Sequence, residues 1–161
     1  ERAGGSARRA MATPVAVADQ LQRVMASLQK VHSQKMIETE LMLDEKLLFY
    51  GEERDLLELL GNLLDNAFKY GKSRVRVSGQ VIAANEARPG LSLCVEDDGS
   101  GIEESQWSKL LQRGVRGDER VEGHGLGLAL VVELVTAYGG EITIAHSGLG
   151  GAAITVTIPP A

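Results

Sequence analysis

The spacing of apolar residues along the chain predicts helices in four segments. They are expected over residues 13–35, 52–70, 106–112 and 126–138. In the first segment, Thr13 is expected to cap the helix and Pro14 to occupy its first turn. Gly71 and the pair Gly139-Gly140 stand where the second and fourth helices are expected to end, because glycine readily leaves the helical conformation.

Runs of β-prone residues predict the strands between these helices. The strands are expected over residues 37–43, 46–50, 74–83, 91–96, 141–146 and 152–158. The first two flank Asp44 and Glu45 and are expected to pair as a hairpin, and a short glycine-rich turn joins the last two. Most connections are too short for parallel crossovers. The pattern therefore predicts an α+β fold: a two-layer α/β sandwich with a mixed, largely antiparallel sheet and helices on one face.

Composition is that of one globular domain, with 161 residues, 43% hydrophobic and 24% charged. Residues 1–12 are small and basic and are expected to be a linker or edge, which leaves residues 13–161 as the domain. A net charge of −5 argues against a general nucleic-acid surface, and no apolar run approaches the roughly 20 residues of a membrane span. The single cysteine, Cys94, excludes an internal disulfide, favours an intracellular protein, and is expected to be a small buried hydrophobe.

One face of the predicted 52–70 helix carries polar side chains that could bind a ligand. At about 100° per residue, Asn62, Asn66 and Lys69 share a stripe. Glu58 joins this stripe one turn earlier. Amide oxygens are hard ligands that suit Mg²⁺, and an ammonium group beside them suits phosphate. A solvated helix face is the alternative, but asparagine is a poor helix former, so two at this spacing favour a site.

A second motif, Asp97-Asp98-Gly99-Ser100-Gly101-Ile102, directly follows a predicted strand. Its glycines let the backbone bend sharply and lie against a flat ligand. The Asp97 carboxylate can accept a hydrogen bond from an exocyclic amino group. Taken alone, the motif is better explained as an ordinary Asp-Gly turn.

A third motif, Gly123-His124-Gly125-Leu126-Gly127-Leu128, opens the predicted 126–138 helix. Free N–H groups at a helix start attract anions, and three arginines that precede the motif could bind phosphate: Arg113, Arg116 and Arg120. Glycine is dense in this region, since 12 of the 19 glycines lie between residues 99 and 151. The spacing matches neither the dinucleotide-binding G-x-G-x-x-G motif nor a P-loop.

In this order, the three motifs resemble the N, G1 and G2 boxes of the catalytic ATP-binding domain of sensor histidine kinases. That domain belongs to the GHKL superfamily, together with Hsp90, MutL and type II topoisomerases. The resemblance covers roughly residues 13–159, and the segments 96–101, 113–116 and 149–152 look most like the PhoQ type of kinase. It implies a Bergerat-type ATP-binding fold, ATP and Mg²⁺ as ligands, and phosphoryl transfer to a histidine on a separate dimerisation domain.

The resemblance also implies a role for each matched residue. Asp97 takes the adenine amino group, and the turn of Gly99, Gly101 and Ile102 lies against the base. Asn62 and Asn66 hold Mg²⁺, while Asn62, Lys69 and Arg116 act in phosphoryl transfer. The remaining implied nucleotide contacts are Lys69, Tyr70, Arg113, Arg116, Arg120, Gly123, His124, Gly125, Leu126, Gly127 and Leu128. Residues 103–123 form a mobile lid, with Trp107, Leu110 and Leu111 where the family usually has a phenylalanine pair.

None of the three histidines is expected to be the phosphoacceptor. His32 is expected to be structural and partly buried, His146 exposed and incidental, and His124 part of the phosphate loop. The chain is therefore expected to bind ATP without phosphorylating itself. The implied partners are its own dimerisation domain and, through it, a response regulator, with no nucleic acid and no direct membrane contact. The implied location is the cytoplasmic side of a membrane-bound sensor.

Two other functions stay open. An ATPase or anti-sigma-type serine kinase of the same superfamily resembles E-x-x-x-N at the first box, where a glutamate can act as a base. Asn62 has no basicity, and Glu58 is the only helical carboxylate nearby. A degenerate nucleotide-binding module ranks lower, because all three boxes are intact.

Overall fold

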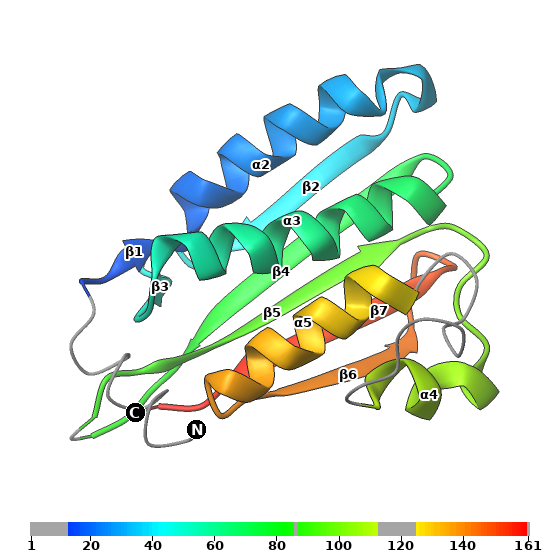
Figure 1. Cartoon of the computed structure of the whole chain (residues 1–161). Coiled ribbons are helices and arrows are strands. Elements are labelled where there is room, and N and C mark those ends of the chain that lie inside the picture. The colour runs from blue at the N-terminus through cyan, green and yellow to red at the C-terminus, as the bar shows by residue number, and fades with distance from the viewer. Residues whose placement is uncertain (1–12, 86, 113–124, 161) are drawn as a thin grey trace.

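The computed structural model describes residues 13–85, 87–112 and 125–160 of the chain (Figure 1). The α-helices among them are α2 (Val17–Val31), α3 (Glu53–Tyr70), α4 (Trp107–Leu111) and α5 (Gly125–Ala137). Two short 3₁₀ turns are η1 (Ser33–Lys35) and η2 (Glu104–Gln106). The strands are β1 (Val15–Ala16), β2 (Glu38–Leu43), β3 (Leu48–Phe49), β4 (Arg74–Ile82), β5 (Gly90–Asp97), β6 (Glu141–His146) and β7 (Ala152–Ile158).

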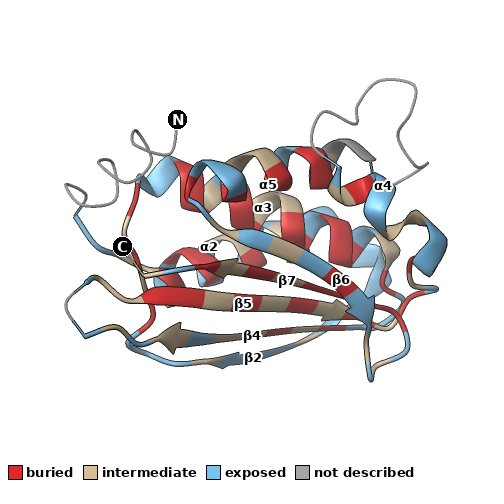
Figure 2. Cartoon of the chain, turned by 90° about the horizontal axis from the view of Figure 1, so that it is seen from below, coloured by how far each residue is buried: buried red, intermediate tan, exposed pale blue. Residues whose placement is uncertain are grey.

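The described part of the chain forms two layers. Five strands make one sheet in the order β2-β4-β5-β7-β6, in which β2 and β4 are parallel and the other neighbours antiparallel. Helices α2, α3 and α5 cover one face of this sheet (Figures 1 and 2). The predicted two-layer sandwich with a largely antiparallel sheet is therefore confirmed.

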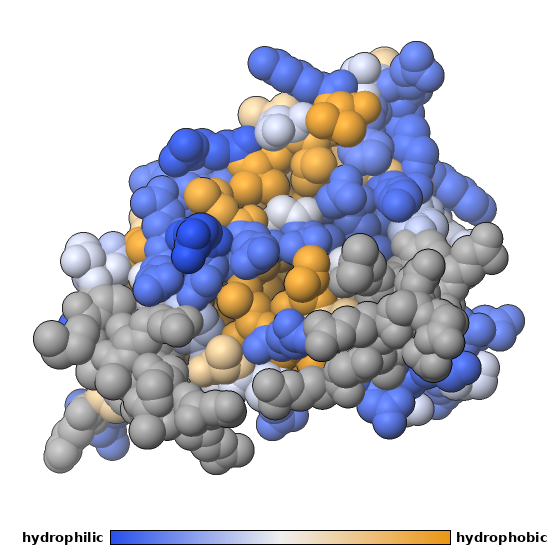
Figure 3. Space-filling view, viewed as in Figure 1, coloured by the Kyte–Doolittle hydropathy of each residue, from blue (hydrophilic) through white to orange (hydrophobic). Residues whose placement is uncertain are grey.

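The core lies between the sheet and the helices. On α3 the buried residues recur at helical spacing, and they include Leu56, Leu60, Leu63 and Leu64, each fully or almost fully buried. Burying one such leucine contributes about 2 kcal/mol. On the outer surface, apolar side chains gather along the line between α2 and α3 (Figure 3), where a shallow groove is lined by Val24, Leu28, Leu57 and Gly61 among others.

Strand β5 alternates strictly between its two faces. Leu91, Leu93, Val95 and Asp97 are buried toward the helices, whereas the residues between them are half-buried on the outer face. The period of two therefore directs the Asp97 carboxylate into the interior, at the end of a core strand. Cys94 lies on the other face, half-buried beside Thr155, so the expectation of a buried core residue is wrong.

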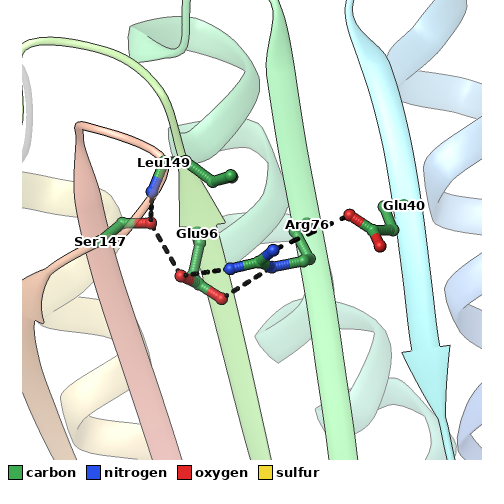
Figure 4. A network of polar contacts seen from close by, with 5 residues as sticks. All are labelled: Glu40, Arg76, Glu96, Ser147 and Leu149. Carbon is green, nitrogen blue, oxygen red and sulfur yellow. Dashed lines mark hydrogen bonds and ion pairs between the residues drawn. The ribbon is translucent and has the colours of Figure 1, made fainter.

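The outer face of the sheet carries a polar network (Figure 4). Arg76 donates two hydrogen bonds to Glu96, at 3.1 and 3.2 Å, and its guanidinium lies 3.9 Å from Glu40. The Ser147 hydroxyl also donates to Glu96, at 2.7 Å. Partial burial acts to raise the pKa of Glu96, but these bonds and the Arg76 charge outweigh it and lower the pKa. The network ties three strands and the β6–β7 turn together on the side away from the helices.

The N-terminal part of the chain differs from the prediction. Thr13 does not cap the first helix, because β1 comes before α2, whose cap residue Ala16 makes no side-chain bond. The helix is also shorter than expected and passes into η1 before Met36 takes a left-handed conformation, with φ 58°.

The predicted hairpin around Asp44 and Glu45 is wrong. The turn there forms, since the Lys46 and Leu47 amides donate to Asp44. However, β2 pairs in parallel with β4, and β3 pairs with β1. After the turn, the chain does not return along β2: Leu47 and Phe49 are buried in the core instead. Helix α3 then connects β2 to β4 as a crossover, which makes these two strands parallel.

Candidate functional site

The candidate site is centred on the Asp97 carboxylate. Its side chain lies at the end of β5 with only 4% of the residue exposed. The Gly99 amide donates to Oδ1 at 2.8 Å, and the Ala152 backbone also donates to this carboxylate. Burial raises the pKa of Asp97, and these two hydrogen bonds oppose the rise. Such a carboxylate can accept a further hydrogen bond from a buried amino group, which is the chemistry predicted for it.

Two glycines around Asp97 are required by close backbone contacts. A β-carbon on Gly99 would lie 2.0 Å from the carbonyl oxygen of Tyr70, so α3 could not approach the strand end. A β-carbon on Gly151 would lie 2.2 Å from Oδ1 of Asp97. Gly101 has a different reason, because its φ of 80° lies in the left-handed region that favours glycine.

Gly151 was missed by the sequence pattern, which predicted only a hairpin turn there. The turn in fact packs on the site, since the Gly151 amide donates to the Asp97 carbonyl at 3.0 Å. The remaining signal in the sequence is the run of small residues Gly150, Gly151, Ala152 and Ala153. A side-chain-poor start to a core strand is typical of close backbone approach.

Helix α3, which carries the predicted polar stripe, ends beside Asp97. Asn66 is buried, with 9% exposed, and Asn62 is half-buried. The Asn62 amide nitrogen donates to the Glu58 carbonyl at 2.8 Å, which leaves its Oδ1 for other partners. Lys69 and Glu58 are exposed, and the Lys69 ammonium lies 5.8 Å from the centre of the Tyr70 ring.

Helix α5 begins beside this stripe. A β-carbon on Gly127 would lie 3.7 Å from Oδ1 of Asn62, so the start of α5 faces the amide oxygen predicted to hold a metal. Leu128 is fully buried and Ile102 is 4% exposed, so both side chains belong to the core and only their backbone is left for a ligand. Gly125 and Leu126 form the first residues of α5.

Several predicted contacts lie outside the described residues. They are Arg113, Arg116, Arg120, Gly123 and His124, together with most of the predicted lid. The part of the predicted lid that is described, residues 103–112, holds η2 and α4. Trp107 anchors it, because its indole N–H donates to the Ile102 carbonyl at 3.0 Å and its ring packs 5.2 Å from that of His146.

Two histidines can be compared with their predictions. His32 is half-buried, as expected, 3.1 Å from Asp65 and 5.8 Å from the Phe68 ring centre. His146 is exposed, as expected, but its ring contact with Trp107 shows that it is not incidental.

The donors of the site fit ATP with a magnesium ion. Among the described residues, no three His, Cys, Asp or Glu side chains group so that they could hold a metal ion. The amide oxygens of Asn62 and Asn66 are the ligands that the sequence predicts for a metal ion. Mg²⁺ takes oxygen ligands and usually keeps several waters beside substrate phosphates, so amide oxygens are compatible with a metal ion that binds together with a nucleotide.

Comparison with known proteins gives a consistent result. Residues 51–161 match the family of histidine kinase-, DNA gyrase B- and HSP90-like ATPases. The sensor kinase CarS of Pseudomonas aeruginosa is 44% identical over 108 residues, which are 67% of this chain and 23% of CarS. The sensor histidine kinase PhoQ of Salmonella typhimurium is 37% identical over 140 residues, 87% of this chain and 28% of PhoQ. The chain thus spans about a quarter of the length of these relatives.

Solved structures show the same fold. The mycobacterial sensor histidine kinase MprB has a TM-score of 0.73 at 25% identity, over 93% of this chain and 98% of the other. The ATP-binding domain of PrrB from Mycobacterium tuberculosis has a TM-score of 0.71 at 25% identity, over 92% of this chain and 97% of the other. Full-length ShkA, solved in complex with AMPPNP, has a TM-score of 0.70 at 26% identity, over 94% of this chain and 31% of ShkA.

In the part of the chain that the structure describes, no helix combines the length and the apolar character needed to cross a membrane.

The family match covers more than half of the chain, and the relatives and solved structures agree with it. The chain belongs to the histidine kinase-, DNA gyrase B- and HSP90-like ATPase family, and it is homologous to the catalytic ATP-binding domains of sensor histidine kinases.

Proposed function

We propose that this chain binds ATP and Mg²⁺ and donates the γ-phosphoryl group of ATP to a histidine on a separate dimerisation domain, as part of a two-component sensor kinase. The observation that supports this most strongly is the buried Asp97 carboxylate. It lies beside Gly71, the residue that follows the asparagine-bearing helix α3. A buried acceptor that must be paired discriminates strongly for a ligand that carries a donor. Adenine offers such a donor in its exocyclic amino group.

Different residues are proposed to contact different parts of the nucleotide. Asp97 accepts the hydrogen bond of the adenine amino group, and Tyr70 contacts the base or ribose. Asn62 and Asn66 hold Mg²⁺, which neutralises phosphate charge when bound. Lys69 binds a phosphate oxygen.

For the phosphate end, we propose residues that lie outside the described part of the chain. Arg116, with Arg113 or Arg120, is proposed to contact the terminal phosphates. The segment from Gly123 to Leu128 is proposed to bind the triphosphate through its backbone N–H groups, since its last residues open α5.

No residue of this chain needs to act as a base. Asn62 cannot accept a proton, but the acceptor imidazole is itself nucleophilic, so orientation of the phosphates and neutralisation of their charge suffice. The proposed partners are therefore ATP, a dimerisation domain that carries the histidine, and a response regulator that takes the phosphoryl group from it. The proposed location is the cytoplasmic side of a membrane-bound sensor, which is what the resemblance to sensor histidine kinases implies.

Nucleotide titration tests the proposal. The wild-type chain should bind ATP in the presence of Mg²⁺, and Asp97→Ala should abolish this binding. In Asn66→Ala, the affinity for ATP should no longer depend on Mg²⁺. Asp65→Ala is the matched control, because Asp65 is an exposed carboxylate on α3 that pairs with His32. Unchanged ATP affinity in Asp97→Ala would sink the site assignment.

Labelled ATP tests the reaction class. The purified chain should take up no γ-phosphate by itself, and incorporation of label would contradict the absence of a phosphoacceptor. Glu58→Gln distinguishes the ATPase alternative, because the exposed Glu58 is one turn from Asn62. Residual ATP hydrolysis that persists in this variant supports the kinase; hydrolysis that disappears supports the ATPase.

A further inference from the structure

The turn between α3 and β4 is held by two opposite charges, one on each side. On one side, the Lys35 ammonium donates to the carbonyls of Phe68, Lys69 and Gly71, at 3.0, 2.5 and 3.0 Å. These carbonyls belong to the last turn of a helix and the residue after it, where the backbone lacks helical partners. A cation there also complements the helix dipole.

On the other side, the Asp98 carboxylate accepts hydrogen bonds from the next residues of the same turn. The amides of Lys72, Ser73 and Arg74 donate to it at 2.9, 3.0 and 3.0 Å, and the Ser73 hydroxyl donates at 2.7 Å. Burial acts to raise the pKa of Asp98, but these bonds outweigh it and hold the pKa well below its usual range. The carboxylate is therefore charged at neutral pH and matched to this turn.

The clamped turn packs against Asp97, the residue proposed to accept adenine. A β-carbon on Gly71 would lie 3.3 Å from the β-carbon of Asp97, and the Tyr70 carbonyl fills the space that a Gly99 side chain would take. The positions of Tyr70 and Asp97 relative to each other thus depend on this turn. Lys35 belongs to η1, which follows α2, whereas Asp98 directly follows Asp97 at the end of β5. Through the α3–β4 turn, these two residues therefore connect the segment after α2 with the end of β5.

We propose that Lys35 and Asp98 are positioning residues, which together hold the α3–β4 turn so that Tyr70 and Asp97 face the same base. The inference rests on the proposed function, because it assumes that Asp97 receives adenine. Neither residue needs to touch the nucleotide. Both act through the backbone between Phe68 and Arg74, so their removal should weaken recognition of the base in a protein that is still folded.

Affinity for two nucleotides separates positioning from general stability. ATP carries the exocyclic amino group that Asp97 is proposed to accept, and inosine triphosphate lacks it. Lys35→Met and Asp98→Asn should each weaken ATP binding about fivefold to tenfold, the factor that about one net hydrogen bond is worth. The affinity for inosine triphosphate should fall by a smaller factor, so the ratio of the affinity for ATP to the affinity for inosine triphosphate should decrease. Lys35→Arg keeps the cation and should restore most of the loss.

The matched control lies at the opposite end of α3. The Tyr138 hydroxyl donates to Asp55 at 2.5 Å and accepts from the Glu52 amide at 3.2 Å, so Tyr138→Phe also removes buried hydrogen bonds from the start of this helix. It should lower stability without changing either nucleotide affinity. All titrations are made at a temperature at which circular dichroism shows each variant to be folded.

The outcomes decide between the two proposals. A wild-type chain that does not bind ATP, or an Asp97→Ala variant that binds it normally, overturns the proposed function and this inference with it. If wild type binds ATP and Asp97→Ala does not, but Lys35→Met and Asp98→Asn keep wild-type affinity and nucleotide preference, only the inference fails. It fails equally if Tyr138→Phe weakens ATP to the same extent, because the effect would then follow stability alone.

Discussion

Replacing Gly151 with alanine should damage both the fold and the proposed nucleotide site. The new β-carbon would lie 2.2 Å from Oδ1 of Asp97, 2.6 Å from the Gly99 nitrogen and 2.7 Å from the Asp97 carbonyl oxygen. These atoms belong to backbone or to a short buried side chain, so no flexible group can swing away. The turn must therefore move by roughly 1 Å to restore an ordinary contact distance.

The cost follows from what that movement breaks. The Gly151 amide donates to Asp97 and its carbonyl accepts from Ser147, at 3.0 and 2.8 Å. Loss of about one net hydrogen bond, with the strain of overpacking, amounts to about 3 kcal/mol. For a domain of this size, this lowers the midpoint of thermal unfolding by about 6–12 °C. Displacement of the carboxylate by about 1 Å should also weaken ATP binding by at least tenfold.

A glycine in the same turn provides the control. A β-carbon on Gly148 has no atom within 4 Å, so Gly148→Ala should change the free energy of unfolding by no more than about 0.5 kcal/mol. Thermal unfolding and ATP titration are measured on both variants. If Gly151→Ala unfolds and binds ATP as Gly148→Ala does, the close packing of the turn on Asp97 is refuted.

Two further variants test other parts of the fold. Because the pKa of Asp98 is lowered in the folded state, the folded protein binds fewer protons than the unfolded chain, and this contribution to stability is lost as the pH falls below the ordinary value of about 4. The urea midpoint of Asp98→Asn should therefore fall less steeply than that of wild type between pH 5 and pH 3, and parallel curves would contradict the charge-based clamp. Trp107→Phe removes the indole bond to Ile102 and should cost about 1 kcal/mol in urea unfolding, with the β-sheet signal in circular dichroism unchanged; a variant as stable as wild type would show that this bond does not anchor α4.

Elements with strong periodicity were predictable from the sequence alone. The α3 helix, strands β4 and β5, and the final pair β6 and β7 lie within a residue or two of their predicted bounds. In each case, one buried face fixes both the period and the register. Strand β2 also lies close to its predicted bounds, but the predicted pairing of residues 37–50 was wrong, because β1 and β3 are only two residues long and the partners of β2 and β3 are distant in sequence. Nothing local in residues 37–50 shows that β2 joins β4 and that β3 joins β1.

The polar residues of the site were predictable for a different reason. Asn62 and Asn66 stand out because asparagine is unfavourable within a helix, and Asp97 stands out because it is a carboxylate at the end of a core strand. Gly151, Lys35 and Asp98 do not break any local rule in this way. Lys35 reads as one of several surface lysines, and Asp98 as part of an Asp-Gly turn. Their partners are mainly backbone atoms of another segment, which the sequence does not reveal.

The need for glycine near Asp97 is explained by packing within the protein, in addition to the predicted contact of the turn with a base. Tyr70 fills the space at Gly99, and Asp97 itself fills the space at Gly151, so both glycines serve contacts within the protein. The carboxylate is enclosed by the end of α3, by its own strand and by the β6–β7 turn, which are far apart in sequence. Because the position of Asp97 is set by all three, a substitution in the turn should alter base recognition as strongly as one in the motif that contains Asp97.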